Sequence, residues 1–166
     1  MEVLFAPWRM AYIEASVKEG SPGGCIFCDI PARPPEEDAK FLVLHRGRRA
    51  FVMMNAFPYN PGHLMVAPYR HVCELSQLDE EEMLELMRLQ ARALEVLKRA
   101  MSPHGFNLGV NLGRVAGAGI PGHMHVHVVP RWEGDTNFMP VVADVKVIPE
   151  ALGRTYEKLK EAWGDA

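Results

Sequence analysis

The sequence predicts an α+β fold with a mainly antiparallel sheet of about five strands, one long helix and shorter flanking helices. Three observations support this prediction. Short segments with strand character follow one another closely, only residues 79–101 show a long helical periodicity, and no strand–helix–strand unit repeats. Strands joined by short turns pair in an antiparallel arrangement, because parallel neighbours need a long crossover connection.

The composition is that of a globular protein that is neither strongly basic nor strongly acidic. Hydrophobic residues make up 48% of the 166 residues and charged residues 23%, which are ordinary values for one domain with a sizeable core. The formal net charge of -3 provides no general attraction to nucleic acid or to an anionic membrane. Neither is therefore an expected partner, and any recognition of phosphate must be local.

The N-terminal residues 1–9 lack the basic-then-apolar pattern of a signal peptide. No apolar run approaches the ~20 residues that a membrane-spanning helix needs. We therefore expect a cytoplasmic protein. In that reducing compartment the three cysteines are expected to be metal ligands or buried thiols rather than a disulfide framework.

The first half of the chain is expected to build three strands after a turn at residues 21–24. Gly47 supports a hairpin between the first two, and residues 55–62, with two prolines and a glycine, form a shaped loop before the third. The three strands are Phe41–His45, Ala50–Met54 and His63–Ala67.

The long helix is predicted from about Asp79 to Met101. Asp79 followed by Glu82 is typical of a capping box, and Pro103 stops the helix. Apolar residues at spacings of three and four predict one stripe that covers the sheet. These residues are Met83, Met87, Ala91, Leu94, Leu97 and Met101.

The second half of the chain is expected to complete the sheet. A fourth strand is predicted at Phe106–Asn111, followed by a glycine-rich loop at residues 113–122 and a histidine-rich strand at residues 122–130. After it, Val141–Ile148 is expected to be extended and Glu150–Trp163 to be a short helix.

Three histidines alternate along the last of these strands, at His123, His125 and His127. On a strand this spacing puts all three imidazoles on one face. A metal site formed by all three fits poorly, because a rise of ~3.3 Å per residue separates the first from the last by about 13 Å. A solvated row of polar rings is a second interpretation. Nucleophilic attack by one imidazole, with its neighbours binding charge, is the third.

The glycine-rich loop favours the third interpretation. Its glycines, Gly117 and Gly119 among them, let the backbone approach a ligand and offer N–H groups to an anion. Phosphate is the anion that both the loop and a row of imidazoles would bind.

A separate pair of cysteines has the spacing of zinc ligands. Cys25 and Cys28 form a C-x-x-C motif. His71 and His123 are candidates for the other two ligands of a Cys₂His₂ site, with Cys73 as an alternative. A pair of packed or free thiols without metal stays open as a second interpretation.

The histidine row also carries a family resemblance. Residues 123–129 match the histidine-triad signature, H-φ-H-φ-H-φ-φ with φ apolar, and residues 60–68 and Asn111 precede it in the order typical of that family. The chain therefore resembles the histidine-triad (HIT) family from about Cys25 to Trp132. The flanking segments resemble its bacterial diadenosine tetraphosphate phosphorylase or hydrolase branch; they are residues 6–13, 58–63 and 130–138.

The resemblance implies a single HIT-like domain over residues 1–166, in which residues 1–24 and 133–166 are extensions. It also implies that His125 attacks the α-phosphorus of a nucleotide and forms a covalent nucleotidyl-imidazole. Water or inorganic phosphate then releases the nucleotide. A neutral imidazole must attack, so its other nitrogen needs an acceptor such as a backbone carbonyl to fix the tautomer.

The resemblance assigns supporting roles to four side chains around His125: phosphate binding to His127 and Asn111, ribose binding to Asn55, and support from the adjacent strand to His63. Many family members carry Gln or Ser three or four residues before the first triad histidine, where this chain has Gly119 and Ile120. Backbone N–H groups of the loop would then assist the leaving group.

Zinc-containing members of the family use the C-x-x-C pair, a later histidine and the first triad histidine. These positions correspond to Cys25, Cys28, His71 and His123, so the resemblance implies a structural zinc with no open ligand position. The resemblance thus gives His123 one of two roles, which are to orient the strand or to bind the metal. No organic cofactor is implied.

The activity implied is cleavage of dinucleoside polyphosphates, diadenosine tetraphosphate in particular, with inorganic phosphate or water as the acceptor. Family members commonly form two-fold dimers, so a homodimer is expected. Two alternatives stay open. One is hydrolysis of adenosine phosphoramidates or other nucleotide conjugates, and the other is a zinc-stabilised nucleotide-binding sensor without turnover.

Overall fold

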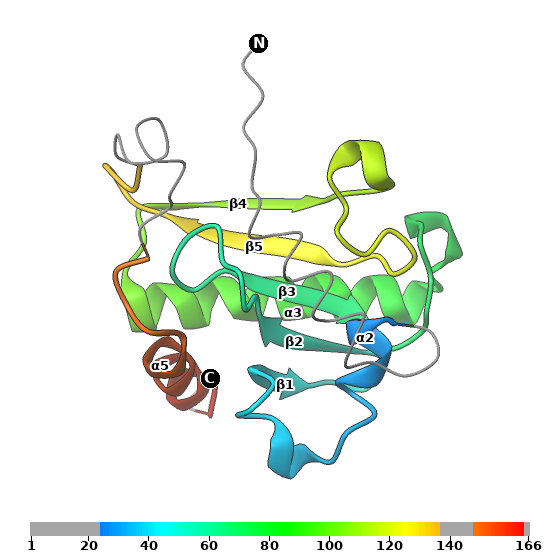
Figure 1. Cartoon of the computed structure of the whole chain (residues 1–166), viewed down its shortest axis with the longest axis horizontal. Helices are drawn as coiled ribbons and strands as arrows, with labels where there is room; N and C mark the ends of the chain where they lie inside the picture. Colours follow the sequence, from blue (N-terminus) through cyan, green and yellow to red (C-terminus); the bar gives the residue numbers. More distant parts are fainter. Residues whose placement is uncertain (1–23, 137–147, 165–166) are drawn as a thin grey trace.

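The computed structural model describes residues 24–136 and 148–164. These residues form an antiparallel five-stranded sheet with helices on both faces, in the strand order β1-β2-β3-β5-β4 (Figure 1). The α+β fold predicted from the sequence is confirmed. The strands are β1 Val43–Arg46, β2 Ala50–Met54, β3 Leu64–Pro68, β4 Gly105–Val110 and β5 Val126–Arg131. The helices are α2 Ile26–Asp29, α3 Glu80–Met101 and α5 Leu152–Gly164, with 3₁₀ turns at Pro35–Glu37, Leu75–Gln77 and Arg114–Ala116.

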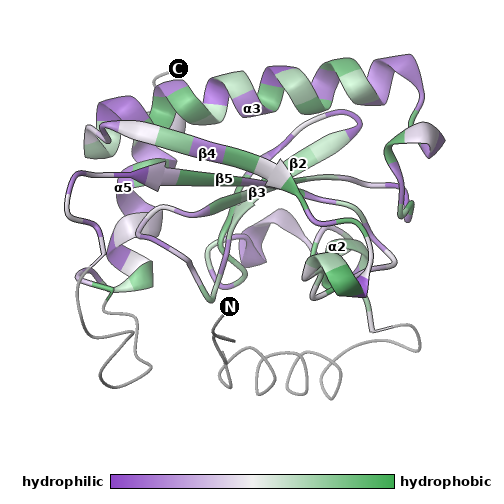
Figure 2. Cartoon of the chain, turned by 90° about the horizontal axis from the view of Figure 1, so that it is seen from above, coloured by the Kyte–Doolittle hydropathy of each residue, from purple (hydrophilic) through white to green (hydrophobic). Residues whose placement is uncertain are grey.

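The sheet separates two apolar clusters. The larger cluster lies between the sheet and helices α3 and α5, and it includes Val66, Leu97 and Trp163. The smaller one lies on the opposite face, where α2 buries Phe27 against residues of β2 and β3. Figure 2 shows α3 and α2 on opposite sides of the sheet. The candidate site residues occupy the α2 face.

Helix α3 begins as predicted but buries a different face. Asp79 and Glu82 form the expected capping box, with the Asp79 carboxylate accepting the Glu82 N–H. The predicted stripe is wrong in its first half, because Met83 and Met87 are 44% and 65% exposed and Ala91 is also exposed. The buried stripe is Leu86, Leu89, Ala93, Val96 and Leu97.

The two stripes are about a quarter of a turn apart on a helix of 3.6 residues per turn. Apolar residues cover both sectors, so spacing alone does not decide which sector faces the sheet. Glu82 is buried on the side of α3 that faces the sheet. Its carboxylate accepts two hydrogen bonds from Arg70, which follows β3, and this contact ties that side of the helix to the sheet.

The histidine segment also departs from prediction. Strand β5 begins at Val126, so His123 and His125 lie in the extended chain that precedes it. This stretch is held by the Met124 N–H, which donates to the Val72 carbonyl at 2.7 Å. The expected alternation is nevertheless present. Met124, Val126 and Val128 enter the core beneath α3, whereas the rings of His123 and His125 contact Phe27 on the opposite face.

The other predicted elements agree to within a few residues, with two qualifications. Residues 25–28, for which no helix or strand is predicted, form the N-cap and the first three residues of the short helix α2. The predicted extended segment Val141–Ile148 lies outside the described residues except for Ile148, as do residues 1–23. None of the helices in the described part of the chain is both long and apolar enough to span a membrane.

Candidate active site and metal site

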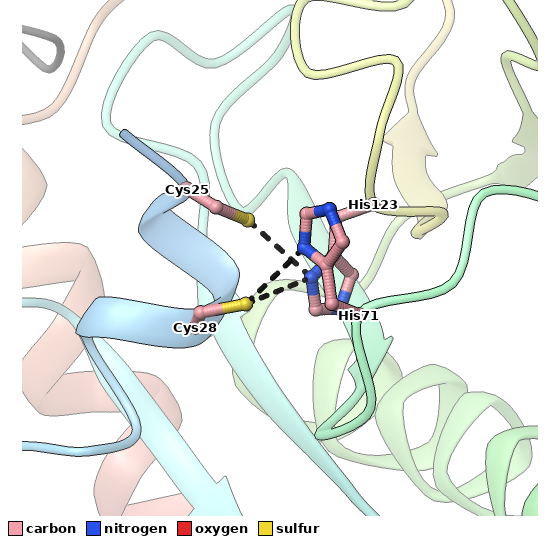
Figure 3. Close-up of side chains that lie close together, drawn as sticks. All are labelled: Cys25, Cys28, His71 and His123. Atoms are coloured by element: carbon pink, nitrogen blue, oxygen red, sulfur yellow. Dashed lines mark hydrogen bonds between the residues drawn. The ribbon is translucent and has the colours of Figure 1, made fainter. Parts of the chain in front are cut away.

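Four predicted metal ligands converge beside helix α2. Cys25 caps the helix and Cys28 follows one turn later, so both sulfur atoms lie on one side (Figure 3). His71 comes from the loop after β3 and His123 from the extended chain before β5. The hydrogen bond from Met124 to Val72 holds these two backbone segments together. The four ligand atoms all lie within 4.8 Å of one another, and this cluster could bind a metal ion.

The separations between the ligand atoms fit a tetrahedral site. His123 Nδ1 lies 3.4 Å from Cys25 Sγ and 3.5 Å from Cys28 Sγ, and His71 Nδ1 lies 3.3 Å from Cys28 Sγ. A tetrahedron with zinc–sulfur and zinc–nitrogen bonds of ordinary length has S···N edges of about 3.5 Å. The two thiols and two imidazoles therefore suit a closed four-coordinate site.

The protonation of the cluster also suits a metal. His123 Nε2–H donates to the Pro68 carbonyl at 2.8 Å, which leaves the Nδ1 lone pair directed at the cysteines. Burial lowers the pKa of His123 to about 4, so the ring is neutral near pH 7. Burial and the neighbouring Cys25 raise the pKa of the Cys28 thiol to about 11. A cation would oppose this effect by favouring the thiolate.

Two neighbours define the limits of the cluster. A Cβ on Gly122 would lie 3.2 Å from His71 Nε2, so a glycine at this position lets the His71 ring approach. Cys73 does not belong to the cluster and places its sulfur 3.4 Å from Gln77 Oε1. Of the histidine row, only His123 joins the metal-binding cluster found among the described residues.

His125 presents a different ring nitrogen. Its Nδ1 lies 3.0 Å from the His123 carbonyl oxygen, which can only accept, so Nδ1 carries the proton. The Nε2 atom then keeps its lone pair. This is the backbone acceptor that the sequence analysis required. Phe27 packs against the imidazole with the two ring centres 4.4 Å apart, which limits rotation of the ring.

A second histidine pair fixes the tautomer of His127. The Tyr59 backbone N–H donates to His63 Nδ1 at 3.1 Å, so the His63 proton is on Nε2. That Nε2–H lies 2.9 Å from His127 Nδ1 and donates to it. His127 consequently carries its own proton on Nε2 and can donate a hydrogen bond. Its ring centre lies 4.8 Å from that of His125.

The other predicted nucleotide-binding residues lie at different distances from these rings. Asn55 Nδ2 is 3.5 Å from His63 Nδ1, and the side-chain Oδ1 of Asn55 accepts the Phe57 N–H in a local turn. Asn111 lines a cavity together with His127. Gly117 has φ of +88°, which favours glycine, and a Cβ there would lie 4.0 Å from Asn111 Nδ2. Gly119 faces open space, because a Cβ there would meet nothing within 4 Å.

The cavity extends beyond the predicted site. Its volume is about 360 Å³, and it runs along β4 and β5 from His127 to Arg131. Tyr59 and Asn60 form one of its walls. The complete lining is Tyr59, Asn60, Asn107, Leu108, Gly109, Asn111, His127, Val129 and Arg131. Phe27, Asn60 and Arg131 also belong to this region, although no motif in the sequence singles them out. The period-two spacing of Arg131, Val129 and His127 is the one sequence signal that could have put Arg131 on the histidine face.

The arrangement supplies two complementary functions within one site. The Nε2 lone pair of His125 can act as a nucleophile, and the Nε2–H of His127 can donate a hydrogen bond. Such a pair suits attack on an electrophile that accumulates negative charge.

The chain is similar in sequence to known proteins. The HIT domain model matches residues 36–134. The chain is 44% identical over 168 residues to a Mycobacterium tuberculosis protein named AP-4-A phosphorylase, covering 98% of this chain and 85% of that protein. It is 32% identical over 93 residues to the asymmetrical bis(5'-nucleosyl)-tetraphosphatase of Schizosaccharomyces pombe, covering 56% of this chain and 50% of that protein.

Solved structures share the fold. A zinc-bound histidine triad family protein from Mycobacterium smegmatis superimposes with a TM-score of 0.66 at 21% identity, covering 85% of this chain and 94% of that one. A hypothetical histidine triad nucleotide-binding protein from Sulfolobus tokodaii gives 0.67 at 24% identity, covering 85% and 93%.

Proposed function

The chain belongs to the HIT-domain family and is an enzyme of that family, and we propose that it cleaves dinucleoside polyphosphates through a nucleotidyl intermediate on His125. Diadenosine tetraphosphate is the proposed substrate. The main observation behind this proposal is that two neighbouring imidazoles are different tautomers. His125 has a lone pair on Nε2, and His127 has a proton on Nε2. The names of the two enzyme relatives support this substrate class.

The proposed first step forms one bond and breaks one bond at the α-phosphorus. The His125 Nε2 lone pair attacks phosphorus, and the bond from phosphorus to the bridging oxygen breaks. That oxygen leaves with its electron pair as the terminal phosphate oxygen of the departing nucleotide. His127 Nε2–H donates to a non-bridging oxygen as negative charge accumulates there. Asn111 contacts the phosphate, and Asn55 contacts the ribose.

In the second step an acceptor oxygen attacks the same phosphorus and the phosphorus–nitrogen bond breaks, which regenerates the His125 lone pair. With inorganic phosphate as acceptor the product is a nucleoside diphosphate. With water it is a nucleoside monophosphate, and the proton released goes to solvent. The name of the Mycobacterium tuberculosis relative favours phosphate.

We further propose that the Cys25, Cys28, His71 and His123 cluster binds structural zinc. Two thiolates and two imidazoles are typical zinc donors, and all four positions of a tetrahedron are filled by protein. The zinc would link α2 to the segment that carries His125. No step of the reaction passes through it.

A homodimer is also proposed. Within the part of the chain that the structure describes, strand β4 forms one edge of the sheet, and Leu108 on it is 45% exposed. An unpaired strand edge with an exposed apolar side chain is a natural place for a second chain. Sedimentation velocity would find a species of twice the chain mass, and a monomer at micromolar concentration would contradict this proposal.

Product analysis tests the proposed activity. Diadenosine tetraphosphate is incubated with the protein, with and without inorganic phosphate, and the nucleotides are separated by chromatography. ATP plus ADP that appears only with phosphate identifies a phosphorylase, and ATP plus AMP without phosphate identifies a hydrolase. His104→Ala is the matched control, because His104 is an exposed imidazole whose side chain, among the described residues, bonds only the Glu133 N–H. Absence of any cleavage, together with turnover of adenosine 5'-phosphoramidate, would replace this function by conjugate hydrolysis. Binding of nucleotide without turnover of either compound would indicate a sensor.

A further inference from the structure

The cavity beside His127 continues for a further four residues along β5. Gly109 of β4 pairs with His127, and Asn107 pairs with Val129. Arg131 lies on the same face as His127, about 13 Å further along the strand. One end of the cavity therefore carries His127 and Asn111, and the other end carries Arg131 and Asn107.

The Arg131 guanidinium is held in one orientation. Its Nε and Nη2 donate to the two Asp135 carboxylate oxygens at 2.5 and 2.9 Å, and its Nη1 donates to Asn107 Oδ1 at 2.8 Å. Asp135 is itself held by Asn60 Nδ2 at 2.7 Å. The bond with Arg131 is the largest cause that holds the pKa of Asp135 well below its usual range, so the ion pair persists at neutral pH.

The carboxylate supports the guanidinium from outside the cavity. Arg131 and Asn107 line the cavity, Asp135 lines a neighbouring hollow, and Asn60 lines both. Three of the five guanidinium N–H groups are engaged by described residues, and the Arg131 side chain is 43% exposed. Two N–H groups are therefore left to donate to a ligand. A planar guanidinium suits phosphate oxygens because its donors are fixed in one plane.

Among the described residues, no side chain obstructs the part of the cavity between His127 and Arg131 at Gly109. Gly109 has no side chain, and a Cβ placed there would meet no atom within 4 Å. Next to it on β5, Val129 is buried. An extended chain of phosphate groups can therefore lie over Gly109 and connect His127 to Arg131 without a steric obstacle.

We propose that this cavity binds the phosphates of the departing nucleotide, and that Arg131 is a specificity-determining residue that contacts the phosphates farthest from His125. The inference rests on the proposed function, in which His125 receives the α-phosphoryl group, and it adds where the leaving group binds. Asp135 and Asn60 are positioning residues that hold the guanidinium. A substrate with a long phosphate chain reaches Arg131, and a nucleotide conjugate with a single phosphate does not.

A purely structural role for the Arg131 network makes a different prediction. Asn60 also donates to the Pro130 carbonyl at 3.0 Å, so the network ties the Tyr59–Asn60 loop to β5. If this tie were its whole purpose, removal of Arg131 would disturb the Tyr59 N–H and the His63–His127 pair. All substrates would then be affected in equal proportion.

Two substrates and two variants separate these roles. Steady-state kinetics are measured with diadenosine tetraphosphate and with adenosine 5'-phosphoramidate, which lacks the distal phosphates. We expect Arg131→Gln to lower kcat/KM for the tetraphosphate at least tenfold, mainly through KM, and to change kcat/KM for the phosphoramidate less than twofold. Gly109→Val fills the cavity without touching the ion pair, and it should produce the same split. Arg88→Gln, which removes an exposed arginine from α3, is the charge-matched control.

Direct binding keeps this proposal distinct from the proposed function. The probe is inorganic tripolyphosphate, measured by calorimetry on the full chain. The wild-type protein and Arg88→Gln should bind it equally, and Arg131→Gln and Gly109→Val should bind it at least tenfold more weakly. Equal binding by all four proteins, or an equal loss of both activities in Arg131→Gln, would overturn the Arg131 proposal. Failure of the wild-type protein to cleave the tetraphosphate would overturn the proposed function, whatever the binding result.

Discussion

His123 and His125 are separated by one residue and have the same side chain, yet they belong to sites of opposite character. His123 donates from Nε2 to the Pro68 carbonyl, so its Nδ1 faces two thiols in a closed cluster. His125 bonds the His123 carbonyl through Nδ1, so its Nε2 keeps a lone pair for chemistry. The backbone carbonyl that each ring contacts therefore determines which nitrogen is available. This difference is what suits His123 to the proposed metal-binding role and His125 to the proposed nucleophilic role.

Phe27 connects the two sites. It lies between Cys25 and Cys28 on α2, and its ring contacts both imidazoles, at 5.3 Å from His123 and 4.4 Å from His125. A metal that fixes the two cysteines would therefore also fix the wall against which His125 rests.

The largest expected effect separates the two histidines by activity. His125→Ala should lower kcat about 10⁴-fold or more, because removal of a nucleophile leaves only the binding contributions. The zinc content should be retained. His123→Ala should lose zinc and lower the unfolding temperature. A His125→Ala protein that retains full turnover would contradict the assignment of the nucleophile.

Removal of the metal tests the other site. Elemental analysis should find about one zinc per chain, and the Cys28→Ser variant should contain much less. We expect this variant, or chelation of the wild-type metal, to lower the free energy of unfolding by about 3 kcal/mol or more, because metal bound only by the folded chain stabilises it.

Cys73→Ser is the matched control for that experiment, because its sulfur lies outside the cluster. It should keep the zinc and the stability of the wild-type protein. A wild-type protein that is purified without zinc and is indifferent to chelator would remove the structural-zinc proposal.

Phe27 provides a smaller, intermediate test of the link between the sites. Phe27 is 1% exposed, so Phe27→Ala should destabilise the fold by about 3–5 kcal/mol through the cavity that it leaves. Phe27→Leu should cost less and is the more informative variant. We expect it to retain zinc and to lower kcat several-fold, because His125 loses a flat surface against which to rest. Unchanged kcat with retained zinc would show that the two sites are independent.

The smallest expected effect concerns how the stability of the protein depends on pH through the Arg70–Glu82 ion pair, which lies next to the metal ligand candidate His71. Arg70 precedes His71, and its bonds to Glu82 are the largest cause that lowers the pKa of Glu82. Because the folded-state pKa lies below the unfolded value, the ionised carboxylate stabilises the protein above the unfolded pKa of about 4.3. This contribution is lost as the pH falls through the folded-state pKa.

Unfolding of Glu82→Gln measured between pH 7 and pH 3 tests the sign. The variant should be less stable than the wild type at pH 7, and the difference should shrink as the pH falls below about 4. A difference that grows on acidification would contradict this account of the Arg70–Glu82 pair.

Most of the secondary structure and the four residues of the metal cluster could be predicted from the sequence, because they depend on short-range patterns. The capping box at Asp79 and Glu82 and the C-x-x-C spacing are short-range patterns that keep their meaning in any fold. His71 is one of several candidates from spacing alone, however, and its segment is brought to His123 by tertiary contacts, which include the hydrogen bonds from Met124 to Val72 and from His123 to Pro68.

The features that could not be predicted depend on contacts between distant segments. The buried face of α3 is decided by how Leu86 and Leu89 meet the sheet, because Met83 and Met87 offer an equally apolar stripe. The position of Phe27 against His125 depends on α2 folding over the sheet. The orientation of Arg131 requires Asp135 and Asn60 together, and Asn60 is 71 residues away along the chain from Arg131.

Trapping of the reaction intermediate tests most directly whether the two neighbouring histidines have separate roles. The protein is mixed with diadenosine tetraphosphate, quenched with base within the first turnover and digested, and its peptides are examined by mass spectrometry and ³¹P NMR. We predict an adenylyl group on Nε2 of His125, absent from the His125→Ala variant and unaffected by Cys73→Ser. An adenylyl group on His123, His127 or His63, or one that persists in His125→Ala, would contradict the account.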